Sequence, residues 1–203
     1  MIYKLYKLLV LITVSFLFTG CKSTLTVDGE FPTPVVNKLP YTLGVLYDKN
    51  FTDYLYTEND NKREEWEIDV GEAQLKLFNT VLPAMFSNVV NVEDLNNSPK
   101  EQIDIFIQPS VDELQYNVPS ETKLNMFEVW IKYNMKVYDN KGLLLADWIL
   151  TAYGKTPTAF MQSQESALNE AMVIALRDAG AGLTLRFSHI PEINNWLKKH
   201  ANR

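Results

Sequence analysis

Histidine and cysteine, the side chains most often used in acid–base and nucleophilic catalysis, are scarce in this chain. The only two histidines, His189 and His200, lie near the C-terminus. A Ser–His–Asp triad would have to use one of them, yet no G-x-S-x-G, P-loop, H-E-x-x-H or C-x-x-C motif occurs. Solvated histidines, or histidines that cap helix ends, are the ordinary alternative. We therefore predict no catalytic residue and no cofactor, and expect that the protein is not an enzyme.

A second chemistry to consider is Ca²⁺ binding by carboxylates. Four acidic side chains crowd one polar stretch: Asp48, Asp53, Glu58 and Asp60. A calcium loop combines such oxygens with a glycine at its sharp turn and a distal glutamate. The stretch D-K-N-F-T-D has neither, so a solvated acidic loop is the favoured interpretation and no metal site is predicted.

One acidic residue stands apart because it lies in an apolar setting. Asp147 is placed between Ala146 and Trp148 in a predicted strand. It is either a buried acid with a raised pKa or an exposed acid paired across the sheet with Lys132 or Lys136. The sequence attaches no second catalytic group to it.

The single cysteine, Cys21, directly follows the N-terminal apolar segment. The apolar run from Leu8 to Phe18 comes after Lys4 and Lys7, and two small residues separate it from the cysteine. A helix needs about 20 apolar residues to cross a bilayer, and this run is shorter. Its length, charged start and small-residue end are those of a signal peptide.

This arrangement resembles the bacterial lipoprotein signal, in which the peptide is cut before a cysteine that carries a diacylglycerol and an acyl chain. The resemblance implies a signal peptide over residues 1–20 and lipidation of Cys21, although Phe18 stands where a leucine is usual. An ordinary secretory signal with an unmodified cysteine is the alternative. In that family an aspartate after the cysteine favours the inner membrane, so Lys22 implies the periplasmic face of the outer membrane.

Overall composition narrows the class of partner. Hydrophobic residues make up 46% of the chain, which is normal for a globular protein. With 19 basic and 25 acidic residues the net charge is −6, which argues against a general nucleic-acid binder. The resemblance to the lipoprotein signal implies contact with a membrane through Cys21 and a protein partner in the cell envelope, and no nucleic-acid partner is expected.

Aromatic side chains in polar surroundings are the candidate partner-binding residues. The segment from Asp48 to Glu65 is too long for a routine connection and has no helical period, so we predict a functional surface there. Aromatic residues serve as interface anchors, but they also close the ends of protein cores. Both interpretations stay open for the five candidates, which are Phe51, Tyr54, Tyr56, Trp66 and Trp130.

The elements that must position these residues are read from hydrophobic periodicity. Residues 21–40 carry three prolines and predict an extended tether. Strands are expected at 41–47 and at 103–107, the second ending before Pro109, and an antiparallel hairpin is expected over 126–154 with its turn at Asp139–Gly142. A helix is expected at 71–89, kinked or broken by Pro83. A second helix starts from an N-cap at Ser163 and either reaches residue 184 or ends near Ala179, and a last helix starts at Pro191.

Strands and helices segregate in this order, which predicts an α+β fold in residues 41–203. We expect one domain, a two-layer sandwich, with an antiparallel or mixed sheet, a long central hairpin and two main helices on one face. The signal, the hairpin FEVWIKYNMKVYDNKGLLLADWILTAYGK and the helix ALNEAMVIALRDAGAGL together resemble small periplasmic accessory lipoproteins of the YajG-like, LptE-like and ABC-transport auxiliary groups. That resemblance implies a domain without an active site that serves an envelope complex.

Three functions remain open at this point. The first is a lipid-anchored periplasmic protein that binds protein partners in envelope assembly or transport. The second is a carrier of a lipid or small apolar ligand, which a continuous apolar cavity would favour. The third is a hydrolase, which would need a cleft that gathers Asp147 with another titratable group.

Overall fold

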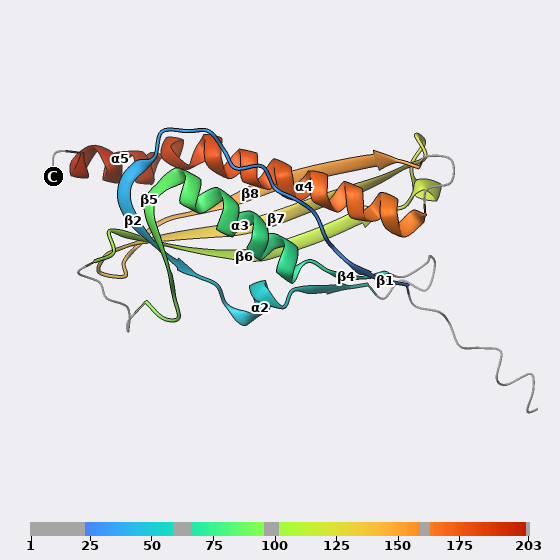
Figure 1. Cartoon of the computed structure of the whole chain (residues 1–203), viewed down its shortest axis with the longest axis horizontal. Coiled ribbons are helices and arrows are strands. Elements are labelled where there is room, and N and C mark those ends of the chain that lie inside the picture. The colour runs from blue at the N-terminus through green and yellow to red at the C-terminus, as the bar shows by residue number, and fades with distance from the viewer. Residues whose placement is uncertain (1–22, 59–65, 96–101, 159–162, 202–203) are drawn as a thin grey trace, which may run out of the picture.

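The computed structural model describes residues 23–58, 66–95, 102–158 and 163–201. Within them the chain builds a five-stranded sheet and a three-stranded sheet, with helices over one face of the larger sheet (Figure 1). The larger sheet has the order β5-β2-β6-β7-β8. Its strands are β2 (Leu39–Leu46), β5 (Phe86–Val92), β6 (Ile105–Asn117), β7 (Met126–Asp139) and β8 (Leu144–Pro157).

The smaller sheet has the order β1-β4-β3 and packs at one end of the molecule (Figure 1). Its strands are β1 (Ser23–Thr26), β3 (Leu55–Thr57) and β4 (Trp66–Asp69). The helices are α2 (Lys49–Thr52), α3 (Gly71–Met85), α4 (Gln164–Arg186) and α5 (Pro191–His200), with short 3₁₀ turns at Pro119–Glu121 and Phe187–His189. None of these helices is long and apolar enough to cross a bilayer.

The predicted fold class is confirmed. Strand β2 runs parallel to both β5 and β6, whereas β6, β7 and β8 are antiparallel, so the larger sheet is mixed. Helices α3 and α4 lie side by side on one face of it (Figure 1). The smaller sheet was not predicted.

The central antiparallel hairpin forms as predicted and turns at Asp139–Gly142. Strands β7 and β8 have 14 residues each and pair from Met126 with Pro157 to Tyr138 with Leu144. The amide of Gly142 donates to the Asp139 carbonyl over 2.9 Å and closes the turn. Alternate β7 residues are at most 1% exposed under the helices: Phe127, Val129, Ile131, Tyr133, Met135 and Val137. This period of two identifies a sheet with one dry face.

The turn supplies a first test of stability. Gly142 has φ 82°, in the left-handed region, where a side chain costs roughly 1–2 kcal/mol. Gly142→Ala is therefore expected to lower the free energy of unfolding by about 1 kcal/mol, measured by urea denaturation. Lys141→Ala in the same exposed turn is the control and should change stability by less than about 0.5 kcal/mol. Equal stability of the two variants would contradict the assigned turn.

Helix α4 does not end near Ala179, which was the shorter of its two predicted lengths. Ser163 caps it as expected, because its hydroxyl oxygen accepts a hydrogen bond from the Ser166 amide over 3.1 Å. The helix continues past Ala179 to Arg186 in spite of its two glycines. A Cβ atom on Gly180 would lie 2.9 Å from a methyl group of Leu77, so the missing side chain lets α3 pack closely on α4. Tertiary packing thus outweighs the low helix propensity of glycine.

Two elements that contain a proline end at other residues than predicted. Strand β6 was expected to end before Pro109 but runs to Asn117. Its pairing with β2 stops at Ile107, so Pro109 lies where β6 has a sheet partner on one side only, and there the missing N–H is tolerated. Helix α3 contains Pro83 in its last turn and ends at Met85 rather than near Val89.

The tether predicted for residues 21–40 is wrong from Ser23 onward. Strand β1 pairs in parallel with β4, and Leu25 and Val27 are each only 3% exposed. The following residues, 28–38, form a segment that we call the strap, which runs along α4 with α3 beside it (Figure 1). Phe31 of the strap is 8% exposed. Residues 23–38 are therefore part of the folded domain.

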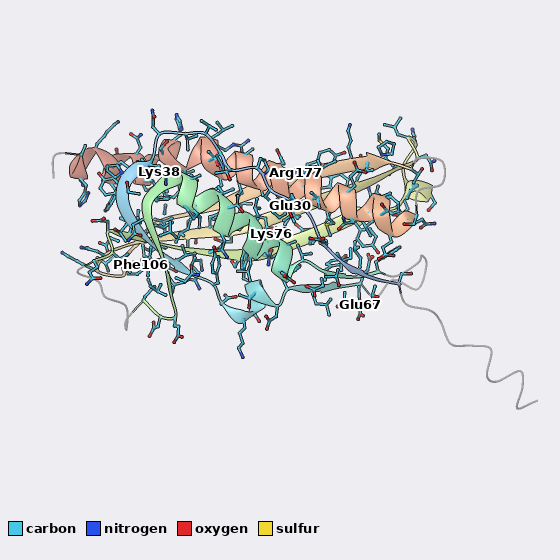
Figure 2. The ribbon with its side chains drawn as sticks, in the orientation of Figure 1. Glu30, Lys38, Glu67, Lys76, Phe106 and Arg177 are labelled. Carbon is cyan, nitrogen blue, oxygen red and sulfur yellow. The ribbon has the colours of Figure 1, made fainter. Side chains whose placement is uncertain are left out.

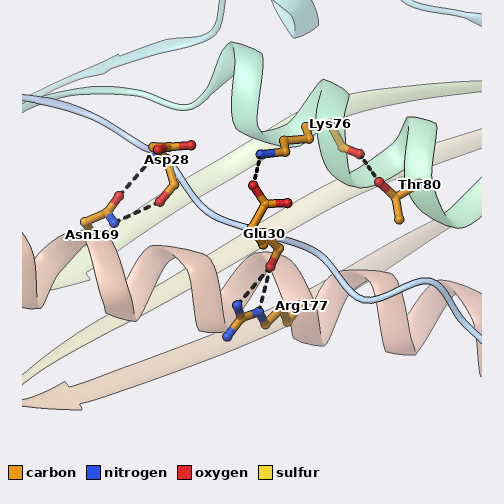
Figure 3. A network of polar contacts seen from close by, with 6 residues as sticks. All are labelled: Asp28, Glu30, Lys76, Thr80, Asn169 and Arg177. Carbon is orange, nitrogen blue, oxygen red and sulfur yellow. Dashed lines mark hydrogen bonds and ion pairs between the residues drawn. The ribbon is translucent and has the colours of Figure 1, made fainter.

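Polar contacts hold the strap to both helices (Figure 3). Asn169 of α4 accepts a hydrogen bond from the Asp28 amide over 3.0 Å and donates to the Asp28 carbonyl over 2.9 Å. The Lys76 ammonium group of α3 pairs with the Glu30 carboxylate at 2.7 Å, and this contact raises the pKa of Lys76. Arg177 donates its Nε and Nη2 hydrogens to the Glu30 carbonyl.

Candidate functional site

Phe51 is fully buried, so it is not a partner-binding anchor. The Asp48 side chain accepts a hydrogen bond from the Phe51 amide over 2.8 Å and starts the short helix α2, which turns the ring inward. Phe51 packs edge-on against Phe78, with ring centroids 5.4 Å apart, and lies 6.2 Å from Tyr133. Gln74, also buried, donates to the Phe51 carbonyl and accepts a hydrogen bond from the Tyr133 hydroxyl.

The other aromatic residues of this region also close the core. Trp66 of β4 is only 4% exposed, so the prediction that it is a partner-binding anchor is also wrong. Tyr56 is partly buried and packs edge-on against Tyr116 of β6 at 5.9 Å. Tyr54 is partly buried as well, and burial raises its pKa. Of the two interpretations of these aromatic residues, closure of the core therefore holds for the four that lie in this region, Phe51, Tyr54, Tyr56 and Trp66. Residues 59–65 lie outside the described ranges.

Trp130 has a different environment, on the face of the larger sheet that the helices leave uncovered. It is partly exposed on β7, and Tyr153 of β8 lies opposite it with ring centroids 5.2 Å apart. The same register places Gln115 of β6 on its other side. We call this surface the open face. It comprises Glu113, Gln115, Asn117, Trp130, Lys132, Thr151 and Tyr153.

An ion pair lies next to the aromatic pair. Lys132 and Glu113 are directly opposite across β6 and β7, and their side chains are hydrogen-bonded. This hydrogen bond lowers the pKa of Glu113 and raises the pKa of Lys132. Gln115 donates a further hydrogen bond to Glu113. Both charged side chains remain partly exposed, so water screens the ion pair. It therefore orients the Lys132 and Glu113 side chains more than it stabilises the fold.

Tyr153 is held in place by Glu128. Its hydroxyl group donates to a Glu128 carboxylate oxygen over 2.7 Å. Burial, followed by this hydrogen bond, raises the pKa of Tyr153 to about 12. The phenol is therefore neutral and oriented near neutral pH, which reduces the entropy that its ring would lose on contact with a partner.

The open face encloses a shallow hollow of about 250 Å³ between β6 and β8. A β-bulge at Asp112 shifts the register between Val111 and Glu113, and such bulges increase the local twist of a sheet. Aromatic residues are enriched at the centres of protein interfaces, and polar and charged residues lie at their rims, so Trp130 and Tyr153 with the neighbouring ion pair fit such a surface. Chemically this face can bind through stacking, hydrogen bonds and charge.

The residues considered for acid–base chemistry have ordinary surroundings. Asp147 is exposed opposite Lys136, which matches the second of its two interpretations. The Nδ1 atoms of His189 and His200 lie 3.0 Å and 2.8 Å from the carbonyl oxygens of Leu185 and Trp196, so each ring donates to a carbonyl near a helix end. No group of three or more potential metal ligands occurs in the described ranges. Cys21 and Asp60 lie outside them.

Sequence reasoning found Trp130 but missed its neighbours Tyr153 and Glu113. A usable signal was present for Tyr153, because a hairpin that turns at Asp139–Gly142 brings β8 residues opposite Trp130. No comparable signal existed for Glu113, since its position depends on a bulge in a strand that was expected to be shorter.

No protein-family model and no curated protein match this sequence. Solved structures with a similar fold include a DUF330-family protein from Xanthomonas campestris, with 10% identity and a TM-score of 0.49, covering 80% of this chain and 89% of that one. A minor lipoprotein from Acinetobacter baumannii has 13% identity and a TM-score of 0.47, with 75% and 94% covered. Lipoprotein B from Nitrosomonas europaea has 14% identity and a TM-score of 0.46, with 85% and 97% covered. At such identities they resemble this chain in fold alone.

Proposed function

We propose that this protein is a lipid-anchored, non-enzymatic component of the Gram-negative cell envelope, held on the periplasmic face of the outer membrane, where it binds a protein partner of an assembly or transport complex. The observation that carries this proposal is the open face. There an aromatic pair, Trp130 and Tyr153, is accessible beside an oriented ion pair. Tryptophan and tyrosine are enriched among the residues that dominate binding energy at interfaces.

The lipid on Cys21 provides the membrane contact in this proposal. Strand β1 begins at Ser23, two residues later, and successive Cα atoms are about 3.8 Å apart. The start of β1 therefore stays within about 8 Å of the lipidated residue. Two or more acyl chains anchor a protein firmly, whereas one chain anchors it only marginally.

The short link also suggests an orientation. The start of β1 lies at the same end of the molecule as the start of β7 and the end of β8 (Figure 1). Trp130 is near the start of β7, roughly 14 Å along the strand from Met126 at about 3.4 Å per residue. The open face would then stand close to the bilayer, which favours a partner that is itself membrane-associated.

Site-specific photocrosslinking in living cells tests this function. A benzoylphenylalanine at Thr151, which is exposed beside Trp130, is expected to give a discrete crosslink to one envelope protein. Adding Trp130→Ala should reduce the yield about tenfold or more, as expected for a residue worth at least about 1.4 kcal/mol of binding. The same probe at Asn195, exposed on α5, is the matched control and should give no such product.

The anchor is tested separately with Cys21→Ser. We expect the wild-type protein to carry acyl chains in intact-mass spectra and to sediment with outer membranes, and the variant to lack both properties. The crosslink from Thr151 should also decrease in this variant because the partner is membrane-associated. An unmodified Cys21 in the mature wild-type protein would contradict the anchor. An equal crosslink yield with and without Trp130 would contradict the binding face.

A further inference from the structure

Three adjoining hollows lie along the strap, between it and the helices α3 and α4. Their volumes are about 300, 230 and 560 Å³. All three are lined by Val36 of the strap, and the first two also share Thr184 and Leu185 of α4. We call them together the strap groove. Sites for small ligands run from roughly 300 to 1,000 Å³, so this groove is large enough to hold one.

The groove has an apolar floor. Leu77 and Val81 of α3 line its first hollow from below, and each is only 2% exposed. Pro34 and Val36 line it from the strap side. Leu185 is 69% exposed at its edge, so apolar surface continues out of the groove into solvent. Contiguous apolar surface rimmed by polar residues is a feature of ligand-binding grooves.

The charge around the groove is positive in a protein whose net charge is −6. Arg177 lines the first hollow and Lys38 the third, and the residues that line the three hollows include neither aspartate nor glutamate. Both cations lie along the strap side of the molecule (Figure 2). The Arg177 guanidinium group donates to the Glu30 carbonyl and has no carboxylate partner within the described residues. The nearby Glu30 carboxylate is already paired with Lys76.

From this geometry we propose that the strap groove binds an anionic amphiphile with a single alkyl chain, of which a fatty acid is the simplest. The alkyl chain lies on Leu77, Val81 and Leu185 beneath Val36, and the carboxylate lies at the mouth beside Arg177. Apolar burial provides most of the affinity, and the guanidinium selects an anionic head group. This site is separate from the open face and does not depend on the partner proposed there.

The strap contacts explain why such a groove persists without a ligand. The strap is fixed to α4 by the paired hydrogen bonds between Asp28 and Asn169, and to α3 by the Glu30–Lys76 pair (Figure 3). These anchors lie on the N-terminal side of Pro32, whereas Val35 is fully exposed and Val36 is 41% exposed. The held end therefore positions the strap, and the arch beyond it leaves room for a chain.

The test uses the full lipidated chain in phosphatidylcholine nanodiscs, with [1-¹³C]laurate as the probe. Nanodiscs without protein give the carboxyl resonance of laurate in the bilayer, and a second, saturable resonance is expected when the protein is present. Ala181→Trp puts a large ring into the first hollow from an exposed position on α4 and should weaken laurate binding about tenfold or more. Asn195→Trp, exposed on α5 and outside the groove, should bind as the wild type does.

A second variant and a second probe separate the groove from its charge. Val36→Asp alters a partly exposed strap residue common to all three hollows, and should weaken laurate binding even if Ala181→Trp folds poorly. Arg177→Met should weaken laurate about two- to fivefold, the size expected for an exposed ion pair. Methyl [1-¹³C]laurate, which is uncharged, should bind to the wild type less tightly than laurate does. It should bind equally well to the wild type and to Arg177→Met.

Three results would overturn the proposal. The first is the absence of a protein-dependent laurate resonance. The second is laurate binding by Val36→Asp that equals that of the Asn195→Trp control, because the groove would then not be the site. The third is wild-type binding of methyl laurate as tight as that of laurate, because the occupant would then not be selected by its negative charge.

Discussion

Gly154→Ala is expected to lower the free energy of unfolding by about 3 kcal/mol or more, the upper range for overpacking a closed core. A Cβ atom at Gly154 of β8 would lie 2.1 Å from the Ala171 carbonyl oxygen and 2.4 Å from the Ala175 amide nitrogen. Both are backbone atoms of α4, so no side-chain rotation relieves the overlap. The helix would have to move away from the sheet, and chemical denaturation monitored by circular dichroism would measure the loss.

The same contact can be tested from the helix side. Ala175 is fully buried against the sheet, so Ala175→Trp should be at least as disruptive as the glycine substitution. The matched control is Gly182→Ala on the same helix, where a Cβ atom would meet only a methyl group of Leu150 at 3.1 Å. That control should be neutral or up to about 1 kcal/mol more stable, because alanine is the better helix former. If Gly154→Ala and Gly182→Ala had the same stability, α4 would not pack on β8 as described.

Phe51→Ala is expected to cost about 3–5 kcal/mol, as large-to-small substitutions of buried aromatic residues do. The ring is fully buried between Phe78 of α3, Tyr133 of β7 and Tyr47, whose ring stacks on it at 5.5 Å. Its removal would leave a cavity where two helices and the sheet meet. It would also loosen the hydrogen bonds of Gln74, which is buried beneath the Phe51 carbonyl. Urea denaturation measures the change.

The control for this variant is Leu55→Ala, four residues later in the same segment. Leu55 is 51% exposed, so its truncation should cost less than about 1 kcal/mol. A Phe51→Ala protein as stable as this control would mean that the segment is a detachable surface loop after all. The expected large difference would instead assign residues 48–58 to the core, and would leave the open face as the binding surface.

Local periodicity accounts for the parts of the fold that were predicted correctly. The alternation from Phe127 to Val137 determines which face of β7 is buried, because successive side chains on a strand point to opposite faces. The turn at Asp139–Gly142 then determines the register of β8, and with it the meeting of Trp130 and Tyr153. The start of α4 at Ser163 is equally local, since a cap needs only its own first turn.

Contacts between distant segments decided the rest. Nothing near Phe51 shows that α3 and β7 will close over it. The strap is held by bonds from Asp28 to Asn169 and from Glu30 to Arg177, across 141 and 147 residues of sequence. A polar, proline-containing segment therefore reads as a tether until the helices beneath it are known. Cys21 could be interpreted from the sequence because the pattern around it is local. The strap groove, in contrast, exists only once the strap, α3 and α4 have come together.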